Sequence, residues 1–151
     1  MLMEHAPGRD LFDELTYAKG NRLSATVSRL YAAQVASGLR YLHEECVAPQ
    51  CIVHRDVKPE NIIVVSSGML RLTDFGFAKA LTSQQGRTFT FVGTPEYMAP
   101  EILAGRHLTP DARAQTGYRC GYGKGVDWWA LGTLIFEMLI GCAPSPNRII
   151  S

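Results

Sequence analysis

The chain has 151 residues, of which 46% are hydrophobic and 19% are charged, and its formal net charge is +1. This length and composition fit a soluble globular domain with a fair-sized core. A net charge so close to zero gives no reason to expect nucleic acid or an acidic membrane surface as a partner. We therefore expect a protein that binds neither nucleic acid nor a membrane.

The cysteines and the apolar segments favour an intracellular protein. The four cysteines form no Cys-x-x-Cys pair, so we expect reduced thiols in place of a disulfide framework. No basic region followed by an apolar run opens the chain, and no signal peptide is expected. Residues 126–143 are apolar but contain Asp127 and Glu137, which favours a buried helix over a membrane span. The expected location is the cytoplasm, without secretion.

Two helices are predicted in the N-terminal third. Residues 10–19 read as a short helix with Leu11, Phe12 and Leu15 on one face, ended by a Gly-Asn turn. Ser24 is the expected N-cap of a second helix over residues 25–45. Its apolar residues recur at intervals of three and four, which indicates a stripe facing a core. That stripe comprises Val27, Leu30, Tyr31, Val35, Leu39 and Leu42.

A loop and a small β-hairpin are predicted next. Residues 46–51 contain a proline and read as a loop. The β-rich runs 62–65 and 70–73 flank Ser-Ser-Gly, which is typical of a hairpin. Between the loop and the hairpin, polar residues crowd into the stretch 54–61, with apolar residues on both sides. Such a stretch forms a rigid platform for a few exposed side chains.

The stretch 54–61 combines three kinds of chemistry. Asp56 is suited to accept a proton, Lys58 to neutralise a developing negative charge, and Asn61 to offer an uncharged oxygen ligand to a hard cation. Asp74 begins an Asp-Phe-Gly turn 13 residues after Asn61, and the hairpin lies between them. We expect the hairpin to bring Asn61 and Asp74 to neighbouring positions, where both could bind Mg²⁺.

The C-terminal half contains one long predicted helix. Residues 80–92 are polar, so we expect them to bury little and to be mobile. A short helix is predicted over residues 99–103, an exposed loop over 106–124 and a mostly apolar helix over 126–140. No regular structure is predicted after residue 140.

Three motifs stand in the order found in protein kinases: His54-Arg55-Asp56 through Asn61, Asp74-Phe75-Gly76, and Ala99-Pro100-Glu101. Residues 74–79, 93–101 and 127–132 resemble the AGC group, near the cyclic-nucleotide-dependent kinases, and residues 3–12 resemble its hinge. The resemblance covers nearly the whole chain except two probable insertions, at residues 44–51 and within 106–121.

The resemblance implies an α+β, mainly helical fold: part of the C-terminal lobe of a kinase, with a small β-hairpin. The implied divisions are a hinge-like segment (1–8), two helices (9–45), catalytic and metal loops (52–76), an activation segment (77–104), an inserted loop (105–125) and a central helix (126–141).

The resemblance also implies roles for residues. Asp56 resembles the catalytic base, Lys58 the group that stabilises the transferred phosphoryl, and Thr94 the threonine that braces both. Asn61 and Asp74 resemble the two magnesium ligands. The implied ATP-binding set is Glu4, Ala6, Asp10, Lys58, Glu60, Asn61, Ile63, Thr73 and Asp74. The alternative, that the adenine and ribose positions are ordinary core or strand residues, stays open.

A regulatory site is implied in residues 87–90. Phosphate on Thr90 would bring strong acceptors near Arg55 and Lys79, whereas the alternative is an unmodified surface threonine. Asp127 resembles the aspartate that holds the catalytic-loop backbone, or is simply a helix N-cap. Glu101 resembles the motif glutamate whose arginine partner would follow the present C-terminus.

We find no Gly-x-Gly-x-x-Gly and no Val-Ala-x-Lys, so the N-terminal lobe is expected to be absent and this chain alone to transfer phosphate very slowly or not at all. The first interpretation is a fragment of a serine/threonine kinase that transfers the ATP γ-phosphate, with Mg²⁺, to Ser or Thr of a protein substrate. An upstream activating kinase would be a further partner. The second interpretation is a truncated, non-catalytic kinase-like module that binds or regulates.

Overall fold

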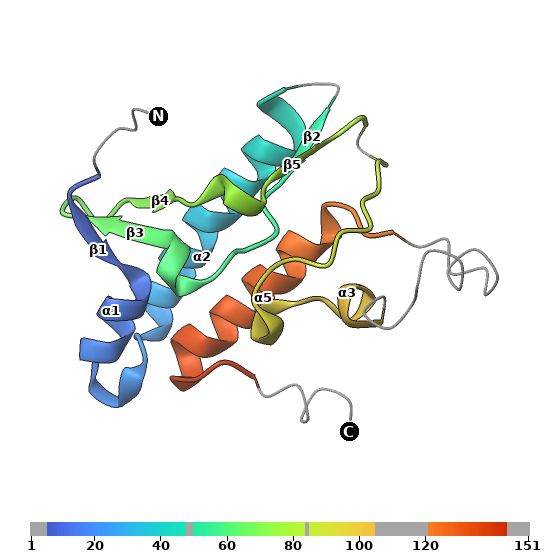
Figure 1. The fold of residues 1–151 in the computed structure, drawn as a ribbon. Helices are drawn as coiled ribbons and strands as arrows, with labels where there is room; N and C mark the ends of the chain where they lie inside the picture. Colours follow the sequence, from blue (N-terminus) through green and yellow to red (C-terminus); the bar gives the residue numbers. More distant parts are fainter. Residues whose placement is uncertain (1–5, 48–49, 84, 105–120, 145–151) are drawn as a thin grey trace.

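The computed structural model describes residues 6–47, 50–83, 85–104 and 121–144. The described chain contains helices and short antiparallel strands, with the strands between residues 8 and 81 and a long helix, α5 (Gly125–Ile140), after them (Figure 1). The α-helices are α1 (Leu11–Tyr17), α2 (Ala25–Arg40), α3 (Pro100–Ala104) and α5 (Gly125–Ile140). The shorter turns are η1 (Lys19–Asn21), the π-helical η2 (Tyr41–Glu45), η3 (Pro59–Asn61), η4 (Phe75–Phe77) and η5 (Pro95–Tyr97).

Two small antiparallel sheets complete the mixed α+β fold. Strands β1, β3 and β4 form one sheet with β3 in the centre, and β2 and β5 form the other. The strand bounds are β1 (Gly8–Asp10), β2 (Cys51–Val53), β3 (Ile62–Val65), β4 (Leu70–Leu72) and β5 (Lys79–Leu81). The β3–β4 pair is the predicted hairpin, with Ile62 opposite Leu72.

Side chains cap both N-terminal helices, as predicted for Ser24, whereas Asp10 was predicted as the first residue of its helix and is the N-cap. The Asp10 carboxylate accepts a hydrogen bond from the Asp13 amide at 2.7 Å, and the Ser24 hydroxyl accepts one from Val27 at 3.3 Å. Both side chains satisfy amide groups that a helix start leaves without intrahelical partners. The second predicted helix corresponds to α2 together with η2.

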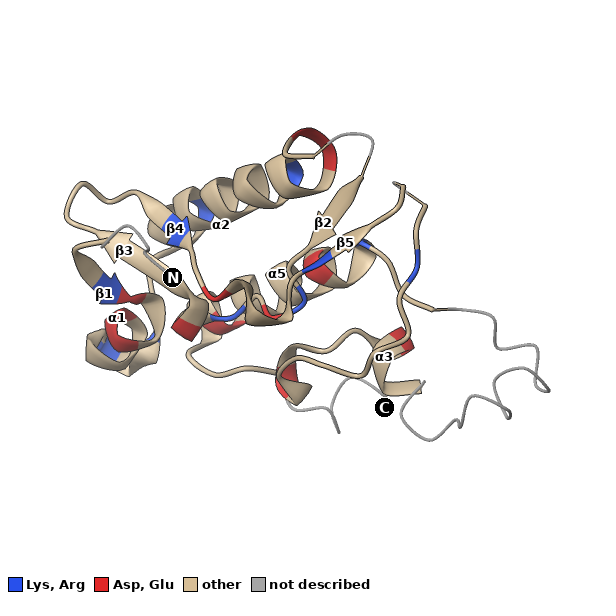
Figure 2. Ribbon diagram, turned by 45° about the horizontal axis from the view of Figure 1, so that its top comes forward, with Lys and Arg blue, Asp and Glu red and all other residues tan. Residues whose placement is uncertain are grey.

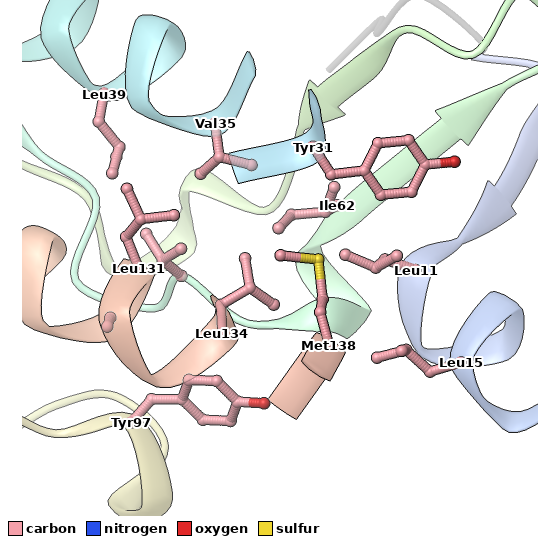
Figure 3. Close-up of a cluster of buried hydrophobic side chains, with 12 residues drawn as sticks. Leu11, Leu15, Tyr31, Val35, Leu39, Ile62, Tyr97, Leu131, Leu134 and Met138 are labelled. Atoms are coloured by element: carbon pink, nitrogen blue, oxygen red, sulfur yellow. The ribbon is translucent and has the colours of Figure 1, made fainter. Parts of the chain in front are cut away.

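A hydrophobic core joins α1, α2, β3 and α5 (Figure 3). α2 and α5 pack against each other, and Leu39 and Leu134 between them are fully buried. The buried members of this core are Leu11, Leu15, Tyr31, Val35, Leu39, Val57, Ile62, Tyr97, Ala130, Leu131, Leu134 and Met138. A second cluster connects β2 and β5 to α3 and the start of α5, and consists of Cys51, Val53, Leu81, Met98, Ala99, Ile102, Tyr122 and Val126. The stretch that joins β2 to β3 begins at Val53 of the second cluster and contributes Val57 to the main core.

The hydroxyl of Tyr31, a residue of the main core, has a hydrogen-bond partner on α1. The Tyr31 hydroxyl donates to the Glu14 carboxylate at 3.0 Å. Burial, with this hydrogen bond and the nearby negative charge as smaller causes, raises the pKa of Tyr31 to about 12. The bond ties α2 to α1 at the edge of the core.

Several sequence expectations are wrong. Leu30 and Phe12, predicted to face the core, are 58% and 47% exposed. On α2 the buried side passes through Ser28, Tyr31 and Val35, and Leu30 lies about 100° from Tyr31 around the helix axis. Residues 80–92 were expected to bury little.

That polar stretch contains buried residues because it pairs with other segments. Leu81 is 4% exposed in β5, which pairs with β2, and neither strand was predicted. Thr88 is 1% exposed and forms a bridge with Tyr122. Tyr122 itself lies within the stretch predicted as an exposed loop and is buried, while residues 105–120 of that loop lie outside the described residues. Both corrections have one physical cause: short runs pair over long distances along the chain, which local pattern does not reveal.

In the described part of the chain, none of the helices has the length and apolar character that a membrane crossing requires. Acidic and basic residues are interspersed over α1, α2 and the loops beside α5 (Figure 2).

Candidate active site

Four side chains meet at the loop between β2 and β3: Asp56, Lys58 and Asn61 from that stretch, and Thr94 from the residue before η5. The Lys58 ammonium lies 3.2 Å from Asp56 Oδ2 and donates to the Thr94 hydroxyl at 2.9 Å. The Thr94 hydroxyl donates to Asp56 Oδ1 at 2.8 Å. Asn61 Nδ2 lies 2.8 Å from both the Asp56 backbone oxygen and Asp56 Oδ2. The residues predicted as base, cation and brace are therefore in direct contact.

The Asp56 carboxylate is nearly saturated by these contacts. It is 4% exposed, so its charge depends on the protein for solvation. An ionised carboxylate offers about four acceptor positions. Within the described residues, Thr94 occupies one on Oδ1, and Lys58 and Asn61 occupy two on Oδ2. One acceptor position on Oδ1 is left, so these contacts fix the orientation of the carboxylate and leave it able to accept from one further hydroxyl donor.

A fully buried carboxylate on α5 holds the backbone of this loop. Asp127 Oδ2 accepts from the His54 amide, and Oδ1 accepts from the Arg55 amide, each at 2.8 Å. His43 Nε2 also lies 2.8 Å from Asp127 Oδ2. Arg55 has a positive φ of 70°, which is uncommon for a side chain other than glycine. The carboxylate satisfies two amides at this turn and so stabilises the unusual backbone immediately before Asp56.

Gly93 positions Thr94 against the same turn. Its φ is 116°, and a Cβ at this position would come within 2.7 Å of the Arg55 backbone oxygen. Only glycine avoids both the strain and the clash. The sequence interpretation did not single out Gly93, although its place directly before Thr94 was the available signal.

The β3–β4 hairpin brings the backbones of the two predicted magnesium ligands, Asn61 and Asp74, close together. The Thr73 amide donates to the Asn61 backbone oxygen at 2.9 Å, so Asp74 follows directly after a residue paired with Asn61. Asp74 has a φ of 55°, and its Oδ1 accepts from the Gly76 amide at 3.1 Å. Because Asn61 donates through Nδ2 to Asp56, its amide oxygen is the atom left for a cation. Two hard oxygen donors on adjacent segments fit Mg²⁺.

Histidine contacts stabilise the junction between the two loops. His54 is fully buried, and its Nε2 lies 3.0 Å from the Thr73 backbone oxygen. Its ring packs edge-to-face on Phe75, with 4.9 Å between the ring centroids. The turn at Asp74 is therefore fastened to the loop that contains Asp56.

The predicted adenine and ribose positions are less closely grouped. Glu4 lies outside the described residues. Asp10 caps α1, and in the sheet it stands opposite Ile63, which is half-buried. The remaining members of the set are the half-buried Ala6 and Thr73 and the exposed Glu60. Asp10, Ile63 and Thr73 thus have structural partners whether or not a nucleotide binds.

A half-buried carboxylate of α5 adds negative charge near Glu60. Glu137 accepts a hydrogen bond from the Tyr97 hydroxyl. Burial raises the pKa of Glu137, Glu60 raises it further, and the hydrogen bond from Tyr97 lowers it. The pKa of Tyr97 is raised as well, first by burial and then by this hydrogen bond. Protonation of Glu137 therefore begins at a higher pH than for an exposed glutamate.

The predicted regulatory residues lie around a tyrosine that the sequence interpretation missed. Arg55 donates through Nε to the Phe77 backbone oxygen and through Nη1 to the Tyr122 hydroxyl, the latter at 3.2 Å. The Tyr122 hydroxyl donates to the backbone oxygen of Thr90, whose side chain is exposed. Arg55 and Thr90 are thus connected through one hydroxyl.

The other two predicted positions are farther from this link. The Lys79 ammonium donates to the Thr88 hydroxyl at 3.1 Å, two residues before Thr90. Glu101 is exposed in α3. For Tyr122, its position between two glycines was the only signal in the sequence.

Comparison with known proteins shows to which family the chain belongs. Residues 1–150 match the model of the protein kinase domain. The chain belongs to the protein kinase family.

The chain is also similar in sequence to individual protein kinases. The chain is 44% identical over 144 residues to the cAMP-dependent protein kinase catalytic subunit PRKX of Homo sapiens, covering 95% of this chain and 34% of that protein. It is 42% identical to the cAMP-dependent protein kinase catalytic subunit of Dictyostelium discoideum, covering 95% of this chain and 18% of that protein. For the cAMP-dependent protein kinase catalytic subunit 3 of Drosophila melanogaster, the identity is 42% and the coverage 95% and 21%. The chain therefore spans about a third or less of these relatives, and the predicted resemblance to AGC kinases is confirmed.

Proposed function

We propose that this chain is part of an AGC-type serine/threonine protein kinase, which transfers the γ-phosphate of ATP to a serine or threonine hydroxyl of a protein substrate. The observation that supports this most strongly is the bracing of Asp56 by Thr94, Lys58 and Asn61, with one acceptor position left on Oδ1. In an ordinary surface loop, a carboxylate would be exposed to water and would not need three side-chain partners.

In the proposed reaction, Asp56 accepts a hydrogen bond from the substrate hydroxyl and then takes its proton. The hydroxyl oxygen forms the new bond to the γ-phosphorus, and the bond to the β-phosphate oxygen breaks to release ADP. The Lys58 ammonium lies beside Asp56 and offsets negative charge on the transferred phosphoryl. Thr94 hydrogen-bonds both groups and keeps the base and the cation at a fixed spacing.

Asn61 and Asp74 would hold Mg²⁺, which when bound neutralises charge on the ATP phosphates. Asn61 donates its amide hydrogens to Asp56, so any cation ligand from this residue would be its oxygen. The same side chain would thus orient the base and bind the cation. Glu4, Ala6, Asp10, Glu60, Ile63 and Thr73 complete the proposed nucleotide-binding set.

The test is metal-dependent nucleotide binding by the longest natural form that contains this sequence. We expect ATP to bind at least about tenfold more tightly with Mg²⁺ than in EDTA, because the phosphate charges need a counter-ion. Asp74→Ala should abolish this difference, and Asp13→Ala, at an exposed carboxylate of α1, should keep it. Equal affinity with Mg²⁺ and EDTA would contradict the proposed site. Tight binding without any phosphate transfer would favour the non-catalytic module.

Thr90 is the proposed regulatory position. A phosphate there would add a charge of about −1.5 to −2 to a segment already joined to Arg55 through Tyr122. We expect phosphorylation of Thr90 to raise the phosphotransfer rate of the longest natural form, and Thr90→Ala to remove that increase. The measurement compares the rates before and after treatment with an activating kinase, with Thr82→Ala, a threonine closer to β5, as the control. Unchanged activity in Thr90→Ala would rule out the switch.

A further inference from the structure

Tyr122 contacts both segments that the proposed mechanism has to keep together. The side chain is 4% exposed. Its hydroxyl accepts a hydrogen bond from Arg55, next to the proposed base, and donates one to the backbone oxygen of Thr90. A single oxygen therefore joins the loop that contains Asp56 to the segment proposed to be phosphorylated.

The backbone of Tyr122 is fixed independently of this hydroxyl. The Thr88 backbone amide donates to the Tyr122 backbone oxygen, and the Tyr122 backbone amide donates to the Thr88 backbone oxygen, each at 2.9 Å. A Cβ on Gly121 would come within 2.8 Å of the Thr88 oxygen, and one on Gly123 within 3.0 Å of the Gly86 oxygen. The two glycines thus permit a close backbone approach, which places the phenol ring between the segments.

The Arg55 guanidinium has capacity beyond its contact with Tyr122. A guanidinium carries five N–H donors. Phe77 and Tyr122 account for two of them among the contacts of the described residues. Tyr122 and an anion can therefore bind the same guanidinium together, and the tyrosine orients it without competing for it.

We propose that Tyr122 is a positioning residue whose hydroxyl couples the segment 86–91 to the catalytic loop and orients Arg55 before Thr90 is modified. The regulatory meaning of this coupling rests on the function proposed above, whereas the coupling itself does not. The two glycines and the paired backbone hold the ring, and the hydroxyl makes the connection.

Hydrogen exchange of the full chain with Tyr122→Phe tests the coupling. This variant removes only the hydroxyl and keeps the ring and the backbone bridge. We expect amide exchange in residues 86–91 to become about ten- to a hundredfold faster, because two hydrogen bonds are lost and one of them has a charged donor. Exchange in α2 should be unchanged. Tyr17→Phe removes the same atom from a ring that is 75% exposed and should change neither segment.

Unchanged exchange in residues 86–91 would overturn the proposal, because the hydroxyl would then hold nothing. Equally faster exchange in α2 would also overturn it, since that result indicates general destabilisation. The exchange experiment needs no phosphate transfer, so it can succeed or fail whether or not the chain proves to be part of an active kinase. If transfer is observed in the longest natural form, Tyr122→Phe should lower kcat about tenfold and leave the KM for ATP unchanged, and an unchanged kcat would refute the role in positioning Arg55.

Discussion

Replacing Asp56 with asparagine should lower the phosphotransfer rate of the longest natural form by about 10²- to 10⁴-fold, the usual contribution of a general base. The amide is nearly the same size as the carboxylate but has lost the basic oxygen and the negative charge that pairs with Lys58. Its NH₂ group also cannot accept the hydrogen bonds from Lys58 or Asn61. The measurement is kcat for a serine peptide at saturating ATP and Mg²⁺.

The matched control is Asp13→Asn, which makes the same chemical change at an exposed position of α1 and should leave kcat unchanged. Nucleotide affinity should fall much less than kcat in Asp56→Asn, because Asp56 is not itself in the proposed nucleotide-binding set and acts on it only through Lys58 and Asn61. If Asp56→Asn retained more than about a tenth of the wild-type kcat, Asp56 would not be the base.

Replacing Asp127 with alanine should destabilise the fold by about 3–5 kcal/mol, as expected when a buried carboxylate with several hydrogen-bond partners is removed. The amides of His54 and Arg55 would lose their acceptor at a turn where Arg55 has a positive φ. His43, which is fully buried, would lose its contact with the same carboxylate. Urea denaturation of the full chain measures the change in the free energy of unfolding.

Glu45→Ala provides the comparison for Asp127→Ala. Glu45 pairs with Arg40 at 3.4 Å, and its side chain is 53% exposed, so the loss should be about 0–1 kcal/mol. The free energy of unfolding of Asp127→Asn should lie between those of Asp127→Ala and Glu45→Ala, because an amide oxygen can still accept one of the backbone hydrogen bonds. An Asp127→Ala variant within about 1 kcal/mol of wild type would show that the carboxylate does not hold the loop.

Local patterns in the sequence predicted the helices and the hairpin well. Ser24 and Asp10 cap helices because their side-chain oxygens reach amides only three residues away. Gly141, with a φ of 93°, ends α5 where the apolar pattern stops. The β3–β4 hairpin follows from two β-rich runs around a short turn. In each case the decisive contact lies within a few residues of the chain.

Contacts between distant segments could not be predicted in this way. Strand β2 pairs with β5, and Thr88 pairs with Tyr122, between residues that lie 26 or more positions apart in the chain. The π-helical turn η2 was likewise predicted as ordinary helix. For the site, the motif order predicted which residues are grouped, but not the close approach of Gly93 to Arg55 or the hydrogen bonds of Tyr122 to Arg55 and Thr90. These contacts depend on backbone shape and on a single hydroxyl, which leave little trace in composition or periodicity.

A crystal structure of the longest natural form with Mg²⁺, a non-hydrolysable ATP analogue and a serine peptide would test the proposed site most directly. We expect the serine hydroxyl to lie within about 2.6–3.2 Å of Asp56 Oδ1, with Mg²⁺ bound to Asn61 and Asp74. A serine hydroxyl far from Asp56, or a cation that contacts neither Asn61 nor Asp74, would contradict the proposed site.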